Sequence, residues 1–153
     1  MLIEYKFNNS KKLFFSSDFH ANHKQPFVWQ KRGFNSPEEH TEFIINVVNQ
    51  KVAEDDNLFH LGDITLNSTE EMFWDFLKKI KCQNIFTLPG NHANPLSRIY
   101  RSEIESEGIV IFPIREVYPY RMSNLIVLPQ HFEFWCEKQY IVLNHYPLGE
   151  WNY

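Results

Sequence analysis

Four short polar motifs carry the residue types that bind divalent metal ions. They are Asp18-Phe19-His20, Gly62-Asp63, Gly90-Asn91-His92 and His145. Carboxylate oxygen, amide oxygen and imidazole nitrogen are all ligands for hard or borderline cations. A carboxylate shared by two ions about 3.5–4 Å apart, with such groups around it, is what hydrolysis of a phosphate ester at a dinuclear centre requires. The motifs therefore predict a metal site of this kind, if the fold brings them together.

Taken singly, each motif has an ordinary explanation. A lone Asp-x-His is usually a pair of exposed surface residues that binds no metal. Gly-Asp after a strand is usually a turn. His145 before Tyr-Pro is compatible with a hydrogen-bonded loop histidine. Their weight comes from position, because each motif follows an apolar run and open α/β sheets place ligands at the carboxyl ends of strands. The i, i+2 spacing of Asp18 and His20 puts both side chains on one face of an extended segment. That spacing favours their binding the same ion.

Hydrophobic periodicity places the elements that would position these motifs. Buried strands are predicted at 13–15, 58–61 and 85–88, with an edge strand at 2–7. Capping signals begin two helices, the first at Ser36-Pro37 with Glu39 and the second at Ser68 to Glu71. The apolar stripes of these helices are Phe43, Ile44, Val47, Val48 and Val52, and then Met72, Phe73, Phe76, Leu77 and Ile80. Strands alternating with helices in this way indicate a parallel βαβ sheet.

The second half of the chain is predicted to be more antiparallel. Strands are expected at 109–112, 115–120, 125–128 and 140–143, and a short helix at 96–107. The stretches 24–35 and 129–139 are predicted to be loops, where substrate specificity would be determined. Of the remaining histidines, His60 is expected in the core because it lies within a strand, and His40 on the exposed first turn of a helix.

Composition limits the classes of function. The chain has 153 residues and a net charge of −4, which suits one domain, 1–153, and argues against an extended nucleic-acid surface. No apolar run approaches the roughly 20 residues of a membrane span. The two cysteines, Cys82 and Cys136, match no zinc or disulfide pattern and are expected to be reduced. We therefore expect a soluble, cytoplasmic protein, and the sequence does not indicate its oligomeric state.

In order and in approximate spacing, the four motifs together resemble those of the calcineurin-like metallophosphoesterase family. The segments Leu61-Gly62-Asp63, Pro89-Gly90-Asn91-His92 and Asn144-His145-Tyr146-Pro147-Leu148 look most like its small bacterial and phage members. The resemblance covers nearly the whole chain. It implies an α/β fold, namely a four-layer αββα sandwich of two mixed β-sheets.

The resemblance also implies the roles of individual residues. Asp18 and His20 would bind a first metal ion, Asp63 would bridge both ions, and Asn91 and His145 would bind the second. The ions would be two divalent metals such as Mn, Fe or Zn. A hydroxide bridging them would hydrolyse a phosphomonoester or phosphodiester, and a nucleotide is one candidate among such small substrates.

His92 would be the catalytic histidine of such a site, where it would hydrogen-bond the phosphate or protonate the leaving oxygen. The family usually has an acidic residue after this histidine to orient it, whereas this chain has Ala93, so another acceptor must do so. His23 and Arg32 are weaker candidates for contacts with substrate. Arg32 could meet a phosphate through its bidentate fork, although a solvated arginine is the commoner case.

One departure from the family leaves alternatives open. The family continues past the position of His145 to a Gly-His-x-His segment, whose two histidines complete the two metal sites and which these 153 residues do not contain. We therefore expect that the C-terminal part of the fold is missing and that metal ions are held weakly. A non-catalytic, protein-binding scaffold with a degraded metal site is an alternative, favoured by Ala93 and by the missing histidine segment and disfavoured by the five retained ligands. A third possibility is a fragment that does not fold by itself.

Overall fold

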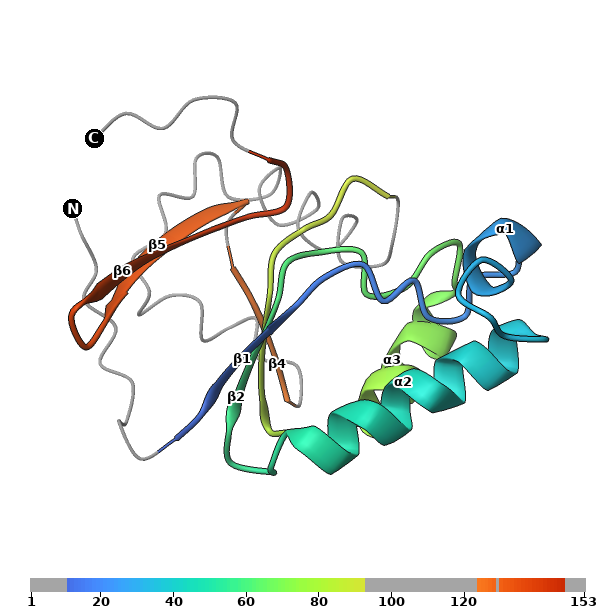
Figure 1. The fold of residues 1–153 in the computed structure, drawn as a ribbon, viewed down its shortest axis with the longest axis horizontal. Coiled ribbons are helices and arrows are strands. Elements are labelled where there is room, and N and C mark those ends of the chain that lie inside the picture. The colour runs from blue at the N-terminus through green and yellow to red at the C-terminus, as the bar shows by residue number, and fades with distance from the viewer. Residues whose placement is uncertain (1–10, 93–123, 129, 148–153) are drawn as a thin grey trace.

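The computed structural model describes residues 11–92, 124–128 and 130–147. The elements in chain order are β1 (Leu13–Ser16), α1 (Pro26–Trp29), α2 (Pro37–Lys51), β2 (Asn57–His60), α3 (Glu70–Lys78), β3 (Asn84–Thr87), β4 (Leu125–Val127), β5 (His131–Cys136) and β6 (Gln139–Asn144). Figure 1 shows their arrangement. Within the described ranges, no helix has the length and apolar character needed to cross a membrane.

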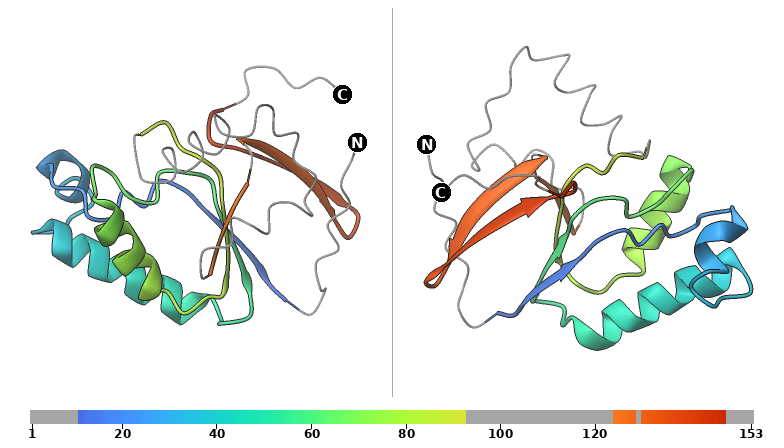
Figure 2. Two further views of the ribbon diagram at one scale, coloured as in Figure 1. Left: turned by 180° about the vertical axis from the view of Figure 1, so that it is seen from behind. Right: turned by 45° about the horizontal axis from the view of Figure 1, so that its top comes forward.

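Two sheets of different type form the described part of the fold. Strands β1 to β4 make a parallel sheet in the order β1-β2-β3-β4, and β5 and β6 make an antiparallel hairpin. Helices α2 and α3 lie on one side of the parallel sheet, and the hairpin lies on the other (Figures 1 and 2). The protein is therefore a mixed α/β fold, and the predicted parallel βαβ arrangement is confirmed.

The apolar side chains of the parallel sheet alternate between its two faces. One cluster joins the sheet to α2 and α3, and the other joins it to the hairpin. Phe59 lies at the centre of the second cluster, where its ring stacks at 5.4 Å on Phe15, 4.8 Å on Phe86 and 5.2 Å on Phe134. Burying such a ring contributes about 2 kcal/mol, so this stack helps to hold the hairpin against the sheet.

Helix α2 begins as predicted. The Ser36 side chain accepts a hydrogen bond from the Glu39 backbone N–H at 3.0 Å. The Glu39 carboxylate, however, accepts from the backbone and side-chain nitrogens of Asn35, at 2.7 and 3.0 Å. The carboxylate thus reaches one residue further back than a capping box requires, and it fixes the turn that leads into the helix.

The predicted cap of α3 was wrong by one residue. Thr69, not Ser68, caps the helix by accepting from the Met72 backbone N–H at 3.2 Å. The Ser68 hydroxyl is buried and donates to Thr65 Oγ1 at 2.7 Å. Two adjacent hydroxyl residues can both serve as caps, and the choice between them depends on a contact that the local pattern does not contain.

The apolar stripe of α2 is rotated relative to the prediction. Phe43 is exposed and Val47 is half-buried, whereas Thr41 and Ile45 are buried. His40, predicted to be exposed, is buried too. His40 lies one helical turn before the buried Ile44. Extending the apolar stripe by one turn toward the N-terminus would therefore have predicted that His40 is buried.

Two predictions for the second half of the chain were wrong. The strand predicted at 125–128 is β4, and it extends the first sheet in parallel with β3 rather than joining an antiparallel sheet. Asn124 explains this, because its buried amide donates to the carbonyls of Leu77 in the last turn of α3 and of Ile80 and Cys82 after it. These contacts tie the start of β4 beside β3. The stretch 129–139, predicted to be a loop, contains β5.

The remaining differences are smaller. The predicted loop at 24–35 includes the single turn of α1. The predicted strands at 2–7, 109–112 and 115–120 and the predicted helix at 96–107 lie outside the described residues.

His60, in β2, is confirmed as a core histidine with no solvent exposure. Its Nδ1 accepts a hydrogen bond from the Gly62 backbone N–H at 3.3 Å, and its ring packs 4.3 Å from that of Phe19. Burial lowers the pKa of His60 from 6.5 to about 3. The imidazole is therefore neutral in the folded protein at pH 7, whereas the unfolded chain takes up a proton below about pH 6.5.

We expect acidification to destabilise the fold through His60. A lowered pKa in the folded state means that stability is lost as the pH falls through 6.5, and between pH 7 and pH 5 this one group accounts for about 2 kcal/mol. The variant His60→Asn offers an amide oxygen to Gly62 but has no titrating ring. Its free energy of unfolding, measured by denaturant titration, should fall less between these two pH values than that of the wild type. Equal losses in the two proteins would contradict this account.

Candidate metal centre

The predicted ligands converge at the carboxyl edge of the parallel sheet. Asp18 and His20 follow β1, Asp63 follows β2, and Asn91 follows β3. Because these strands are parallel and adjacent, their carboxyl ends lie at one edge. His145 comes directly after β6, and its ring reaches this edge from the hairpin. Segments from four strands thus contribute to one cluster.

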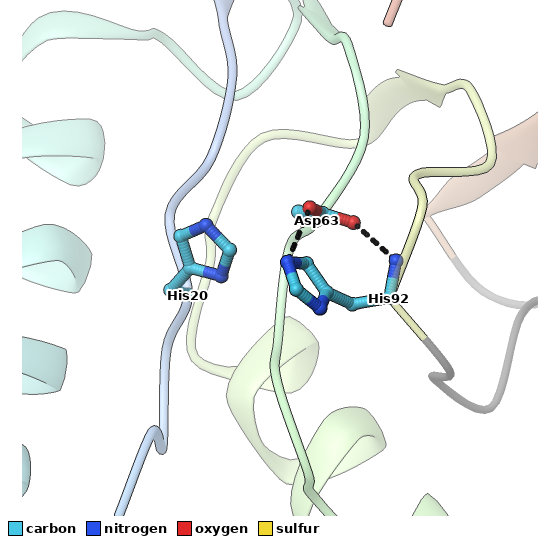
Figure 3. Close-up of side chains that lie close together, drawn as sticks. All are labelled: His20, Asp63 and His92. Atoms are coloured by element: carbon cyan, nitrogen blue, oxygen red, sulfur yellow. Dashed lines mark hydrogen bonds and ion pairs between the residues drawn. The ribbon is translucent and has the colours of Figure 1, made fainter. Parts of the chain in front are cut away.

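Asp63 belongs to both groups of side chains that could hold a metal ion. The ligand atoms of His20, Asp63 and His92 all lie within 4.8 Å of one another, as do those of Asp18, Asp63 and His145. Figure 3 shows the first group, with the carboxylate of Asp63 facing the His92 ring. Asp63 is also the residue to which the family resemblance assigns a bridging role, and that role stays a prediction.

The pairs predicted to share an ion are also adjacent. The Oδ1 atom of Asp18 lies 3.5 Å from Nε2 of His20, and Oδ1 of Asn91 lies 2.7 Å from Nε2 of His145. The two geometric groups nevertheless place Asp18 with His145 rather than with His20. Which residues share which ion therefore stays a prediction.

The Asp63 carboxylate is buried with few partners. It is 1% exposed, and one oxygen accepts a hydrogen bond from the His92 backbone N–H at 3.3 Å. The other oxygen lies 3.6 Å from Nε2 of both His92 and His145. Among the residues that the structure describes, no lysine or arginine pairs with it. A buried carboxylate is costly unless a cation or strong donors compensate it, so this is a place where a metal ion fits.

The orientation of His145 leaves a lone pair in the cluster. Its Nδ1 lies 2.8 Å from the Leu61 carbonyl oxygen, which can only accept, so that Nδ1 carries the proton. In the neutral ring, Nε2 is then an acceptor, and it faces the acceptor Oδ1 of Asn91 at 2.7 Å. Adjacent ligand atoms on an octahedral ion are about 3 Å apart. A ring fixed by a main-chain carbonyl is also typical of metal-binding histidines.

His20 is prepared for the same role by burial. Its side chain is 13% exposed, and its Nδ1 is buried without a hydrogen-bond partner. Burial lowers the pKa of His20, although the nearby carboxylates of Asp63 and Asp18 act in the opposite direction. The neutral imidazole that results is the form that binds metal ions.

The loops that carry the ligands adopt an unusual backbone conformation. Asp18, His20 and Asp63 have φ angles of 55°, 49° and 60°, in the left-handed region. The expectation that Asp18 and His20 lie on an extended segment was therefore wrong, and they meet because the chain turns sharply at both. Each such residue costs about 1–3 kcal/mol, and strain of this kind clusters at functional sites.

Two glycines are needed for the close approach of these loops. A Cβ atom on Gly90 would lie 1.8 Å from Oδ1 of Asp63. A Cβ atom on Gly62, whose φ is +112°, would lie 2.6 Å from Nδ1 of His145. The sequence indicated turns at these glycines, and the structure adds that they make room for the ligands.

Part of the cluster is exposed to solvent. The side chains of Asp18 and His92 are 46% and 42% exposed, whereas that of His145 is 8% exposed. The His92 ring lies 5.4 Å from the His20 ring and nearly perpendicular to it. A small ligand arriving from solvent would therefore meet His92 and Asp18 first, with Asp63 beneath them.

The two weaker candidates contact the loop that carries the ligands. His23 is buried, and its ring lies 6.2 Å from that of His20, which favours a supporting place behind it. Arg32 donates to the main-chain carbonyls of Asp18 and Phe19, both at 2.9 Å. A contact of either residue with substrate stays a prediction. Sequence reasoning missed the contacts of Arg32, because nothing in the local pattern indicates where its side chain reaches.

Comparison of the chain with protein-family models, curated proteins and solved structures found no match. The arrangement of these side chains, rather than a relative, is therefore what bears on function. It brings two carboxylates, an amide oxygen and three imidazoles to the open edge of a parallel sheet, where they can hold divalent cations.

Proposed function

We propose that the protein is a phosphoesterase that depends on two divalent metal ions such as Mn, Fe or Zn. Asp18, His20, Asp63, Asn91 and His145 would hold the ions. The observation that carries the proposal is the buried carboxylate of Asp63, which is common to both groups of candidate ligands and has no described lysine or arginine as a partner. Bound divalent ions would supply the positive charge that polarises a phosphate ester and acidifies water.

His92 is the residue best placed to act on a substrate. Its side chain is 42% exposed, and its ring lies beside Asp63 and His20 rather than beneath them. The backbone N–H of the same residue holds Asp63. We propose that the imidazole donates a hydrogen bond to a phosphate oxygen or a proton to the leaving oxygen. A contribution of that kind is worth about 10²–10⁴-fold in rate.

We further propose a fold for the whole chain and a class of substrate. The helix layer, parallel sheet and antiparallel hairpin of the described residues are compatible with three layers of a four-layer αββα sandwich in a single domain, 1–153. An open site with bound cations suits a small phosphomonoester or phosphodiester, such as a nucleotide. We also propose that the protein is cytoplasmic.

A protein-binding scaffold with an inactive metal site is the second candidate, because Ala93 follows His92 where the resembled family has an acidic residue. A scaffold has no need of metal ions, so the two functions differ in a measurement that does not require the substrate.

The Asp63→Asn variant should lose both metal binding and activity. The substitution removes the one charge common to both groups of ligands while keeping the shape of the side chain. We also expect the metal-free variant to melt at a higher temperature than the metal-free wild type, because a buried carboxylate is replaced by a neutral amide. Calorimetric titration with Mn²⁺, hydrolysis of p-nitrophenyl phosphate and its bis ester, and thermal unfolding provide the three readouts.

Asp75→Asn is the matched control for Asp63→Asn. It makes the same chemical change on the exposed face of α3, where Asp75 pairs with Lys78, so metal binding and activity should both be retained. Wild-type protein that folds but takes up no Mn²⁺ would favour the scaffold. Full activity in Asp63→Asn would overturn the assignment of the site.

The His92→Asn variant should separate catalysis from metal binding. If His92 acts on the substrate, kcat falls about 10²–10⁴-fold while the Mn²⁺ affinity stays within about twofold of the wild-type value. Its position within 4.8 Å of His20 and Asp63 also allows a role as a ligand. An affinity loss as large as the loss of kcat would show that role instead and contradict our assignment.

A further inference from the structure

We propose that Arg32 is a positioning residue, which holds the loop of Asp18 and His20 in the conformation that binds metal. This inference rests on the metal centre proposed above. Arg32 lies after α1, outside the cluster of ligands, and its guanidinium group reaches back to the main chain of that loop. It would act through the ligands and not on the substrate.

The guanidinium group bridges two successive carbonyls. One terminal nitrogen, Nη2, donates to the carbonyl oxygen of Asp18 at 2.9 Å, and the other, Nη1, donates to that of Phe19 at 2.9 Å. A planar fork with two parallel donors fits such a pair of oxygens, whereas the single ammonium group of lysine does not. The contact therefore fixes the orientation of both peptide units that join Asp18 to His20.

The loop is held from its other side by the segment that carries Asp63. The backbone N–H groups of Asp18 and His20 donate to the carbonyls of Gly62 and Asp63, at 3.1 and 3.0 Å. The N–H groups of the loop thus point to one ligand segment and its carbonyls to Arg32. Because both ligands have left-handed φ angles, the loop needs such partners on both sides to keep its shape.

Arg32 is itself fixed by a buried histidine of α2. Nη1 lies 3.0 Å from Nε2 of His40. Since a guanidinium can only donate, His40 Nε2 accepts and its Nδ1 carries the proton. The His40 ring is buried and packs 5.1 Å from that of Phe34. Helix α2 therefore restrains Arg32, and Arg32 restrains the loop of Asp18 and His20.

Electrostatics and positioning predict opposite effects when Arg32 is removed. The guanidinium is a positive charge near the proposed cation site, so its loss alone would strengthen the binding of a divalent cation. Loss of the two carbonyl contacts would instead loosen Asp18 and His20 and weaken binding. Residues that orient metal ligands typically change metal affinity by about 10–100-fold when mutated. The sign of the change therefore distinguishes the two roles.

The test is calorimetric titration of the full chain with Mn²⁺ in three variants. Arg32→Gln and Arg32→Lys should both bind Mn²⁺ at least about 10-fold more weakly than the wild type, the lysine variant because it keeps the charge but not the fork. Lys31→Gln removes a neighbouring exposed charge and should change the affinity by less than about twofold. Unchanged or tighter binding in Arg32→Gln, or full affinity in Arg32→Lys, would overturn the proposal.

Amide hydrogen exchange of the metal-free protein provides a second readout that needs neither metal nor activity. In Arg32→Gln, and equally in Arg32→Lys if the former does not fold, the N–H groups of Asp18 and His20 should exchange faster than in the wild type, while those of β3 should not change. Equal protection of the loop in wild type and variants would refute positioning. Wild-type protein that binds no Mn²⁺ would refute the proposed function instead, so the two failures are distinguishable.

Discussion

The burial of the Asp63 carboxylate is the constraint on which the rest of the site depends. A charge that is 1% exposed needs compensation, and the fold surrounds this one with imidazoles and with a backbone N–H from His92. Gly90 leaves no side chain in the space that the carboxylate occupies. The surroundings place donors and lone pairs around the carboxylate but no described lysine or arginine, and that combination suits a cation supplied from outside the chain.

The parallel sheet makes this arrangement of ligands possible. Three adjacent strands end at one edge, so that ligands distant in sequence need only short loops to meet. The stack of Phe15, Phe59, Phe86 and Phe134 holds the hairpin against the sheet, and it therefore fixes where His145 can reach. The position of the candidate ligand His145 therefore depends on the aromatic packing in the core.

The sequence was sufficient for the features that depend on local patterns. The apolar runs before Asp18, Asp63 and Asn91 predicted strands β1, β2 and β3, and the cap at Ser36 predicted the start of α2. What could not be read depends on contacts between distant residues, such as those of Asn124 that place β4 beside β3. The hairpin strand β5 was missed even though its apolar residues alternate, because its flanking polar residues resemble those of a loop.

The backbone conformation of the candidate site differs from the one predicted. The predicted ligands Asp18, His20, Asp63, Asn91 and His145 all lie in the cluster, yet three of them adopt left-handed backbone conformations that no pattern of residue types specifies. Such strain persists only where surrounding contacts determine it, and here the carbonyls of Gly62 and Asp63 and the guanidinium of Arg32 provide them. The fold therefore gives up some stability to hold acceptor atoms close together, and this arrangement would lower the ordering cost of binding a cation.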